Sequence, residues 1–169
     1  MSQGIMNILA ENRGKSISVS VTRPNDTTAY AANDVIGTAT SGNLTFTDIV
    51  PRQGAGFLVL GSRLRIDVNA VPSGMAGFRL HLYNAAPTAI ADNAAFNLPS
   101  GDRTKYLGYI TMSTPVDFGD TLVAVDDNMN FSGKCADGST TIYGMLETLG
   151  AYTPAASTVK TVTLNAVGV

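Results

Sequence analysis

The chain has 169 residues and a mass of 17.6 kDa, which is the size of one domain and enough to bury a hydrophobic core without disulfides. Hydrophobic residues make up 44% of it and charged residues only 14%, so we expect a mostly neutral surface with many hydrogen-bonding groups. The net charge of −2 and the scattered basic residues argue against nucleic-acid binding, because phosphate contacts need clustered lysine and arginine.

The first segment, residues 1–15, reads MSQGIMNILAENRGK and has no basic region followed by a long apolar run, so it does not resemble a signal peptide. Apolar runs elsewhere, such as FLVL at 57–60, are too short to span a bilayer, so we expect no membrane contact. We expect residues 1–15 to form an extended or partly helical arm that docks on a neighbouring subunit. The candidate inter-subunit contacts in this arm are Ile5, Met6, Ile8, Leu9, Arg13 and Lys15.

Residues 17–23 (ISVSVTR) alternate apolar and polar side chains, which predicts a strand with one buried and one wet face. Pro24 ends this strand because proline cannot donate a hydrogen bond to the ladder. The residues that follow form a polar corner, and the next strand is expected at 34–38. Tyr30 is the one large side chain in the corner, and we expect its ring to close an end of the sandwich with its hydroxyl bonded or wet.

The same period of two recurs along the rest of the chain. It predicts strands at 64–70, 78–84 and 162–166. Further strand candidates lie at 43–49, 56–60, 105–112, 121–125 and 140–149. Glycine and proline turn signals separate these strands, and one wet face per strand favours antiparallel pairing. Many short strands at roughly ten-residue spacing are typical of a β-sandwich or barrel. We therefore expect an all-β, antiparallel sandwich.

The longest segment without a strand pattern is the alanine-rich connector at 84–99. Asp92 is placed to cap a single helical turn within it. We expect the connector to cross from one sheet to the other, as Greek-key topologies require.

Four segments lie along the chain from about Val21 to about Thr158: VTRPNDTTAYAANDVIG, RLHLYNAAPTAIADNAAFNL, KYLGYITMSTPVDFGD and IYGMLETLGAYTPAAST. In pattern and order they resemble segments of the jelly-roll cement, or head-decoration, proteins of tailed bacteriophages. The resemblance implies a single sandwich domain of jelly-roll type over residues 16–169. Related segments also occur in tail-associated phage proteins, and residues 1–15 lie outside the resemblance.

The resemblance also implies a role. The protein would be a dimer or trimer on the outer surface of the virion, assembled in the host cytoplasm. It would bind the major capsid protein and stabilise contacts between capsid subunits, with no enzymatic activity, cofactor or metal.

The residues themselves suggest no reaction. His81 is the single histidine and falls on the polar face of its strand, so a surface or interface position is favoured over a catalytic base. Cys135 is the single cysteine and is expected to be an inert thiol, and one histidine with one cysteine is too few for a zinc site.

Two polar features leave alternatives open. Asp126, Asn128 and Asn130 have the alternate spacing of a calcium loop, but Phe131 replaces the required glycine, so a polar hairpin end is favoured. The acid pairs Asp117 with Asp120 and Asp126 with Asp127 suggest glycoside hydrolysis only weakly, since the chain has no tryptophan.

A tail- or fibre-associated carbohydrate-binding module is the alternative function. Its sugar-binding faces would be those of Tyr83, Tyr106, Tyr109, Tyr143 and Tyr152.

Overall fold

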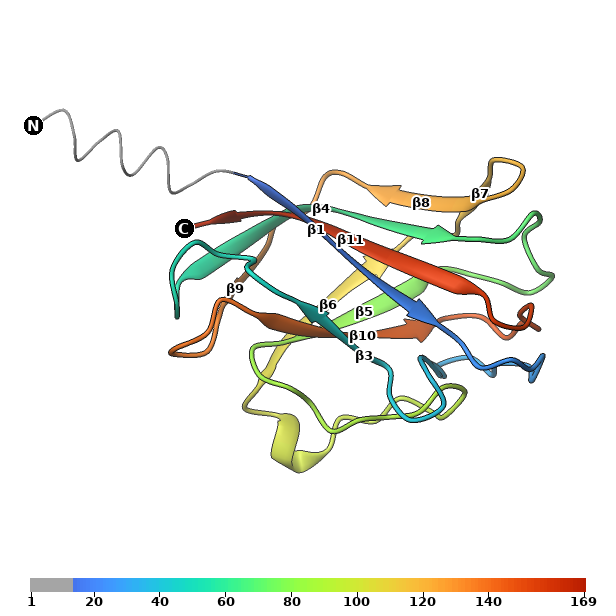
Figure 1. Ribbon diagram of the computed structural model, residues 1–169, viewed down its shortest axis with the longest axis horizontal. Coiled ribbons are helices and arrows are strands. Elements are labelled where there is room, and N and C mark those ends of the chain that lie inside the picture. Colours follow the sequence, from blue (N-terminus) through green and yellow to red (C-terminus); the bar gives the residue numbers. More distant parts are fainter. Residues whose placement is uncertain (1–13) are drawn as a thin grey trace, which may run out of the picture.

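The computed structural model describes residues 14–169, which form two antiparallel β-sheets packed face to face (Figure 1). The first sheet has the order β1 (Lys15–Thr22), β11 (Val159–Gly168), β4 (Gly56–Ile66), β8 (Leu122–Asp126) and β7 (Val116–Asp117). The short strand β9 (Phe131–Lys134) pairs with the same edge of β4 as β8 does. β8 pairs with residues 62–66 of β4, and β9 pairs with residues 56–59. The second sheet has the order β2 (Val35–Ile36), β10 (Ile142–Thr148), β5 (Phe78–Tyr83) and β6 (Tyr106–Met112), and β3 (Asn43–Phe46) pairs with β10 beside β2.

Both sheets interleave strands from the beginning and the end of the chain. In the first sheet β1 lies beside β11, the last strand, which in turn pairs with β4 (Figure 1). In the second sheet β10 lies between β2 and β5. This interleaving over two sheets is the order of a jelly roll. The predicted all-β, antiparallel sandwich is therefore confirmed.

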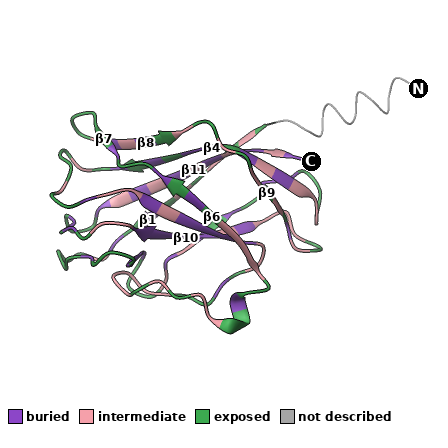
Figure 2. Cartoon of the chain, turned by 180° about the vertical axis from the view of Figure 1, so that it is seen from behind, coloured by how far each residue is buried: buried purple, intermediate pink, exposed green. Residues whose placement is uncertain are grey.

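The core lies between the sheets and is built from the apolar face of each strand. Along β1 and β11 the exposed fraction alternates residue by residue, as the sequence pattern predicts (Figure 2). Phe57, Leu64, Leu80, Leu146 and Leu164 are completely buried. Burial of each such side chain favours folding by about 1.5–3 kcal/mol, so this shared core holds the two sheets together.

The strands expected at 56–60 and 64–70 are one strand, β4, and this prediction was wrong. Phe57 and Val59 point inward at odd positions, whereas Leu64 and Ile66 point inward at even positions. A register shift opposite Asn165 and Ala166 inserts one extra residue into β4 and reverses the alternation. A bulge therefore produced the phase change that resembled a break between two strands.

The alanine-rich connector does not cross between the sheets. It joins β5 to β6, which are neighbours in the second sheet, and covers that sheet's outer face (Figure 1). Ile90, Phe96 and Leu98 of the connector pack there against a small second core of Val35, Tyr83 and Met145. This cover explains why β5 and β10 are buried on both faces.

The connector ends in η1 (Ser100–Asp102), a single 3-10 turn and the only helix in the described part of the chain. No helix between residues 14 and 169 is long and apolar enough to cross a membrane.

The predicted arm lies almost wholly outside the described residues, and with it Ile5, Met6, Ile8, Leu9 and Arg13. Lys15, which the sequence places in the arm, is instead the first residue of β1. It pairs with Ala166, and its Nζ donates a hydrogen bond to the carbonyl oxygen of Asp48 at 2.6 Å.

Candidate functional site

His81 lies on the outer face of the second sheet, but it is only 3% exposed. The prediction of a surface or interface histidine was therefore wrong. Phe96 of the connector stacks on the imidazole, with ring centroids 3.7 Å apart and planes 9° from parallel. A strand pattern shows which residues face away from the core, but not whether another segment covers them.

Three strands contribute polar groups to the cluster around His81. Its Nε2 lies 2.7 Å from Oε2 of Glu147 on β10, and its Nδ1 lies 2.9 Å from the hydroxyl of Tyr106 on β6. Arg79 donates to the same Glu147 oxygen at 3.0 Å, and its guanidinium lies over the ring of Tyr109. Glu147 thus has its negative charge compensated by Arg79 within a buried site.

Burial lowers the pKa of His81 below its ordinary value, although the carboxylate of Glu147 opposes the shift. The imidazole is therefore neutral at pH 7. A neutral ring has one N–H, so Nε2 donates to Glu147 and Nδ1 accepts from Tyr106. Both ring nitrogens are engaged by protein groups, and the cluster ties β5, β6 and β10 together beneath the connector.

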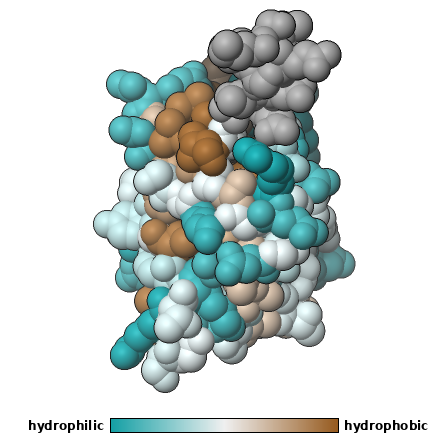
Figure 3. Space-filling model, turned by 90° about the vertical axis from the view of Figure 1, so that its left-hand side faces the viewer, coloured by the Kyte–Doolittle hydropathy of each residue, from teal (hydrophilic) through white to brown (hydrophobic). Residues whose placement is uncertain are grey.

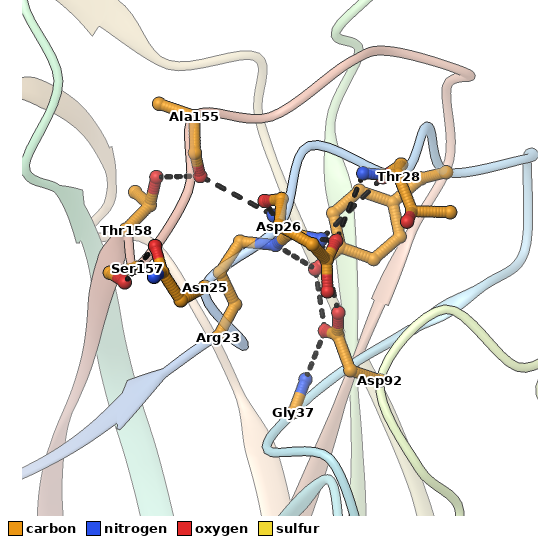
Figure 4. Close-up of polar contacts among 10 residues, drawn as sticks. Arg23, Asn25, Asp26, Thr28, Gly37, Asp92, Ala155, Ser157 and Thr158 are labelled. Atoms are coloured by element: carbon orange, nitrogen blue, oxygen red, sulfur yellow. Dashed lines mark hydrogen bonds and ion pairs between the residues drawn. The ribbon is translucent and has the colours of Figure 1, made fainter.

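A second polar cluster occupies one end of the sandwich and is centred on Arg23, whose side chain is fully buried (Figure 4). Its guanidinium contacts Asp26 at 3.0 Å and Asp92 at 3.3 Å, and its Nε donates to the hydroxyl of Tyr30 at 3.3 Å. Tyr30 in turn donates to Asp92 at 2.6 Å, and the backbone N–H of Gly37 donates to the same carboxylate oxygen at 2.9 Å.

This cluster decides two sequence predictions. Tyr30 closes the end of the sandwich with its ring buried and its hydroxyl bonded, as predicted. Asp92 does not cap a helical turn. It joins the connector to the corner, because its carboxylate takes hydrogen bonds from residues 55 to 69 positions away in the sequence.

Lys160 was missed by the sequence analysis. It lies on the inner face of β11, is 1% exposed, and places its Nζ 5.8 Å from the centroid of the Tyr30 ring. A signal was present, because the alternation of Val162 and Leu164 extended backwards puts residue 160 on the buried face. A lysine at such a position is unusual, since lysine is almost never fully buried unless paired.

The remaining candidate groups are structural. Cys135 is buried, and burial raises the pKa of its thiol, which fits the predicted inert thiol. Asp126 ends β8 and accepts a hydrogen bond from the backbone of Ser113 at 3.2 Å. The loop after Asp126 is not a hairpin end, because β8 and β9 both pair with β4 in the same direction. The metal-ligating side chains of residues 14–169 form no group of three that could hold an ion.

The expected patch of exposed tyrosines is not formed. Tyr83 and Tyr152 are buried, Tyr106 and Tyr143 are partly buried, and Tyr109 alone is exposed, at 53%. A shallow groove of about 260 Å³ opens beside Tyr109, between β6 and residues 129–131. The carbohydrate-binding alternative thereby loses the surface on which it relied.

The outer face of the first sheet has a different character from that of the second. Strand register places two rows of side chains across it, which together we call the open face. The rows are Ser20, Thr161, Arg65, Val123 and Val116, and Ser18, Thr163, Arg63 and Val125. In each row β1 and β11 contribute hydroxyl side chains, β4 contributes one arginine, and the strands beyond β4 contribute valine. Hydrogen bonds of 2.8 Å join Ser18 to Thr163 and Ser20 to Thr161.

The end of the molecule that carries the C-terminus is mixed in character. Figure 3 shows hydrophobic residues there in small separate patches among hydrophilic ones. That view shows no continuous apolar face. Compared with this end of the molecule, the open face has the more regular arrangement of side chains.

Comparisons with known proteins give structural similarity alone. No family model matches the chain, and no curated protein matches it significantly. A chain from the capsid of Ralstonia phage GP4 is similar, with 13% identity and a TM-score of 0.44, covering 92% of this chain and 84% of that one. A chain of turnip yellow mosaic virus is similar with 7% identity and a TM-score of 0.30, covering 93% of this chain and 80% of that one.

Proposed function

We propose that this protein is a non-enzymatic structural component of a bacteriophage virion. In this proposal it binds the outside of the head as a dimer or trimer and stabilises contacts between subunits of the major capsid protein. The sequence resemblance to cement proteins supports the role. In the structure, the first of the four segments that carry this resemblance forms the corner. The second forms part of β5 and the connector, the third forms β6 and β7, and the fourth forms β10 and the loop that follows it.

The open face is the observation that carries the proposal. Within residues 14–169 no segment covers this sheet surface of hydroxyl, guanidinium and aliphatic groups, and Val116 and Val125 are exposed at 59% and 43%. Such a surface suits close contact with another protein, since its hydroxyls supply hydrogen bonds and its valines supply apolar area. Repetition of a modest contact over a lattice, by a dimer or trimer with several contacts, makes attachment effectively permanent.

Co-sedimentation with expanded phage heads that lack this protein tests the proposal. We expect many copies to bind each head and the heads to become more resistant to heat. A double variant, Val116→Asp with Val125→Asp, should lose most of this binding. The matched control is Val71→Asp, which places the same charge at a residue 38% exposed but outside the open face.

Each outcome of this experiment has a definite meaning. Failure of the wild-type protein to bind heads would refute the head-binding role, and a few copies at one vertex would favour a tail position. Equal binding by the double variant and the control would exclude the open face as the contact surface.

The arm is proposed as a second contact, through Ile5, Met6, Ile8, Leu9 and Arg13. The structure sharpens its test, because deletion of residues 1–13 leaves the pairing of Lys15 with Ala166 and its bond to Asp48 intact. We expect the truncated protein to unfold at the same temperature as the wild type but to bind heads weakly. Undiminished binding would count against a role for the arm.

A further inference from the structure

Strand β6 is the outermost strand of the second sheet on the side away from β2 and β3. In the described part of the chain it pairs with β5 alone, and no backbone hydrogen bond joins its other edge to a loop. Every second residue of an edge strand turns its backbone N–H and C=O away from the sheet. β6 therefore offers a free hydrogen-bonding edge to another extended segment.

The shallow groove beside Tyr109 lies at this free edge. One side of it is formed by residues 109–111 of β6 and the other side by residues 129–131. Met129 and Phe131 are partly buried and pack against the main core, whereas the ring of Tyr109 is 53% exposed. An extended segment that adds to β6 would place its side chains against these apolar groups.

The sequence itself supplies a segment of the right chemistry. Residues 5–9 of the arm read IMNIL, which is four apolar side chains around one asparagine. In an extended strand Ile5 and Leu9 share one face, and Met6 and Ile8 share the other. Both faces of such a strand are apolar, so it can contact the groove on either side of its backbone.

The arm of the same chain is too short to fill the groove with all of residues 5–9. Strand register aligns Lys15, Ala166, Val59 and Phe131 in one row across β1, β11, β4 and β9. Three strand spacings of this row are about 14 Å. β11 and β4 block the direct path, and a path over the outer side-chain layer adds about 5 Å at each end, to roughly 24 Å. The six residues from Lys15 back to Leu9 span at most about 22 Å.

We propose that this groove binds residues 5–9 of the arm of a second copy of the chain. The arm adds as an extended strand to the free edge of β6, and its apolar side chains cover Tyr109, Met129 and Phe131. In a two-fold dimer each chain donates one arm and receives one, so the two contacts form together. The inference rests on the dimer of the proposed function, and it leaves the open face free to contact the head.

The mass of the full chain in solution, measured by light scattering after size-exclusion chromatography, tests the proposal. We expect the wild type to be a dimer and the chain without residues 1–13 to have half its mass. Tyr109→Asp, which places a charge in the groove, should also be a monomer. The matched control is Phe118→Asp, which places the same charge at an aromatic side chain that is 72% exposed and outside the groove, and it should stay a dimer.

A mixture of two deficient chains distinguishes a partner's arm from a chain's own arm. The truncated chain keeps its groove, and Tyr109→Asp keeps its arm. An equimolar mixture should therefore form a heterodimer through one contact between arm and groove. If each arm bound the groove of its own chain, the mixture would contain monomers alone, and the proposal would be wrong.

A synthetic peptide of residues 1–13 locates the contact when it is added to the truncated chain labelled with nitrogen-15. The backbone amide resonances of residues 107–111 and 129–131 should shift, and Tyr109→Asp in the truncated chain should abolish the shifts. A control peptide with Ile8→Asp and Leu9→Asp should cause no shifts.

Three results would overturn the proposal: a wild-type monomer, a dimer that persists without residues 1–13, or peptide-induced shifts centred elsewhere on the sandwich. None of these measurements uses phage heads. A failure of arm exchange is therefore distinguishable from a failure of head binding, which co-sedimentation measures separately.

Discussion

Replacement of Lys160 by methionine tests how a charge is tolerated inside the sandwich. Methionine keeps an unbranched chain of similar length and removes the ammonium group. Burial lowers the pKa of Lys160 from 10.5 to about 8. Since one pKa unit corresponds to about 1.4 kcal/mol, the protonated amine destabilises the folded state by about 3 kcal/mol at pH 7. We expect Lys160→Met to be more stable than the wild type by an amount of this order.

The pH dependence follows from the same two pKa values. Between pH 8 and 10.5 the unfolded chain holds a proton on Lys160 that the folded chain has released, so the free energy of unfolding rises with pH. From pH 7 to 9.5 the wild type should gain about 2 kcal/mol. Above about pH 10 the gain reverses, because burial raises the pKa of Tyr30 and Tyr152 in the folded state only.

Urea denaturation followed by circular dichroism is the assay, at several values between pH 7 and 9.5. Lys160→Met should show no gain over this range. Lys134→Met, which removes the same charge from a side chain that is 66% exposed, should follow the wild type. A Lys160→Met variant that gains stability in parallel with the wild type would refute the reasoning.

Three further predictions test other parts of the fold. Asp92→Asn should destabilise the protein by about 3 kcal/mol or more, because it leaves a buried guanidinium without its buried charge partner. Asp26→Asn, on the exposed side of the same guanidinium, should have little effect, and equal losses in urea denaturation would contradict this distinction. Gly77→Ala should lower the melting temperature, because the added Cβ would lie 2.5 Å from a backbone oxygen, whereas Gly101→Ala meets nothing within 4 Å and should be neutral. The single histidine resonance in an NMR titration should report a pKa for His81 below 6.5, and stability should fall as the pH drops from 6.5 through that value; a pKa above 6.5 would contradict the buried, neutral assignment.

Most strands could be predicted because their signal is local. The alternation in residues 17–23 and 162–166 identifies both the strand and its inner face, since successive side chains of a strand always point to opposite sides. Tyr30 was placed correctly for a similar reason, as a large ring in a polar corner has few places to pack apart from the end of the core. The sequence by itself therefore determined the all-β class and the inner face of the strands whose alternation is regular.

The tertiary structure decided what covers each outer face and which charges meet. His81 and Arg65 both lie on the polar side of a strand, yet His81 is buried by the connector whereas Arg65 stays exposed on the open face. Arg23, Asp92 and Lys160 are far apart in the sequence and come together at one end of the sandwich. Burial and charge pairing depend on segments that are remote along the chain, and a local alternation of side chains carries no information about those segments.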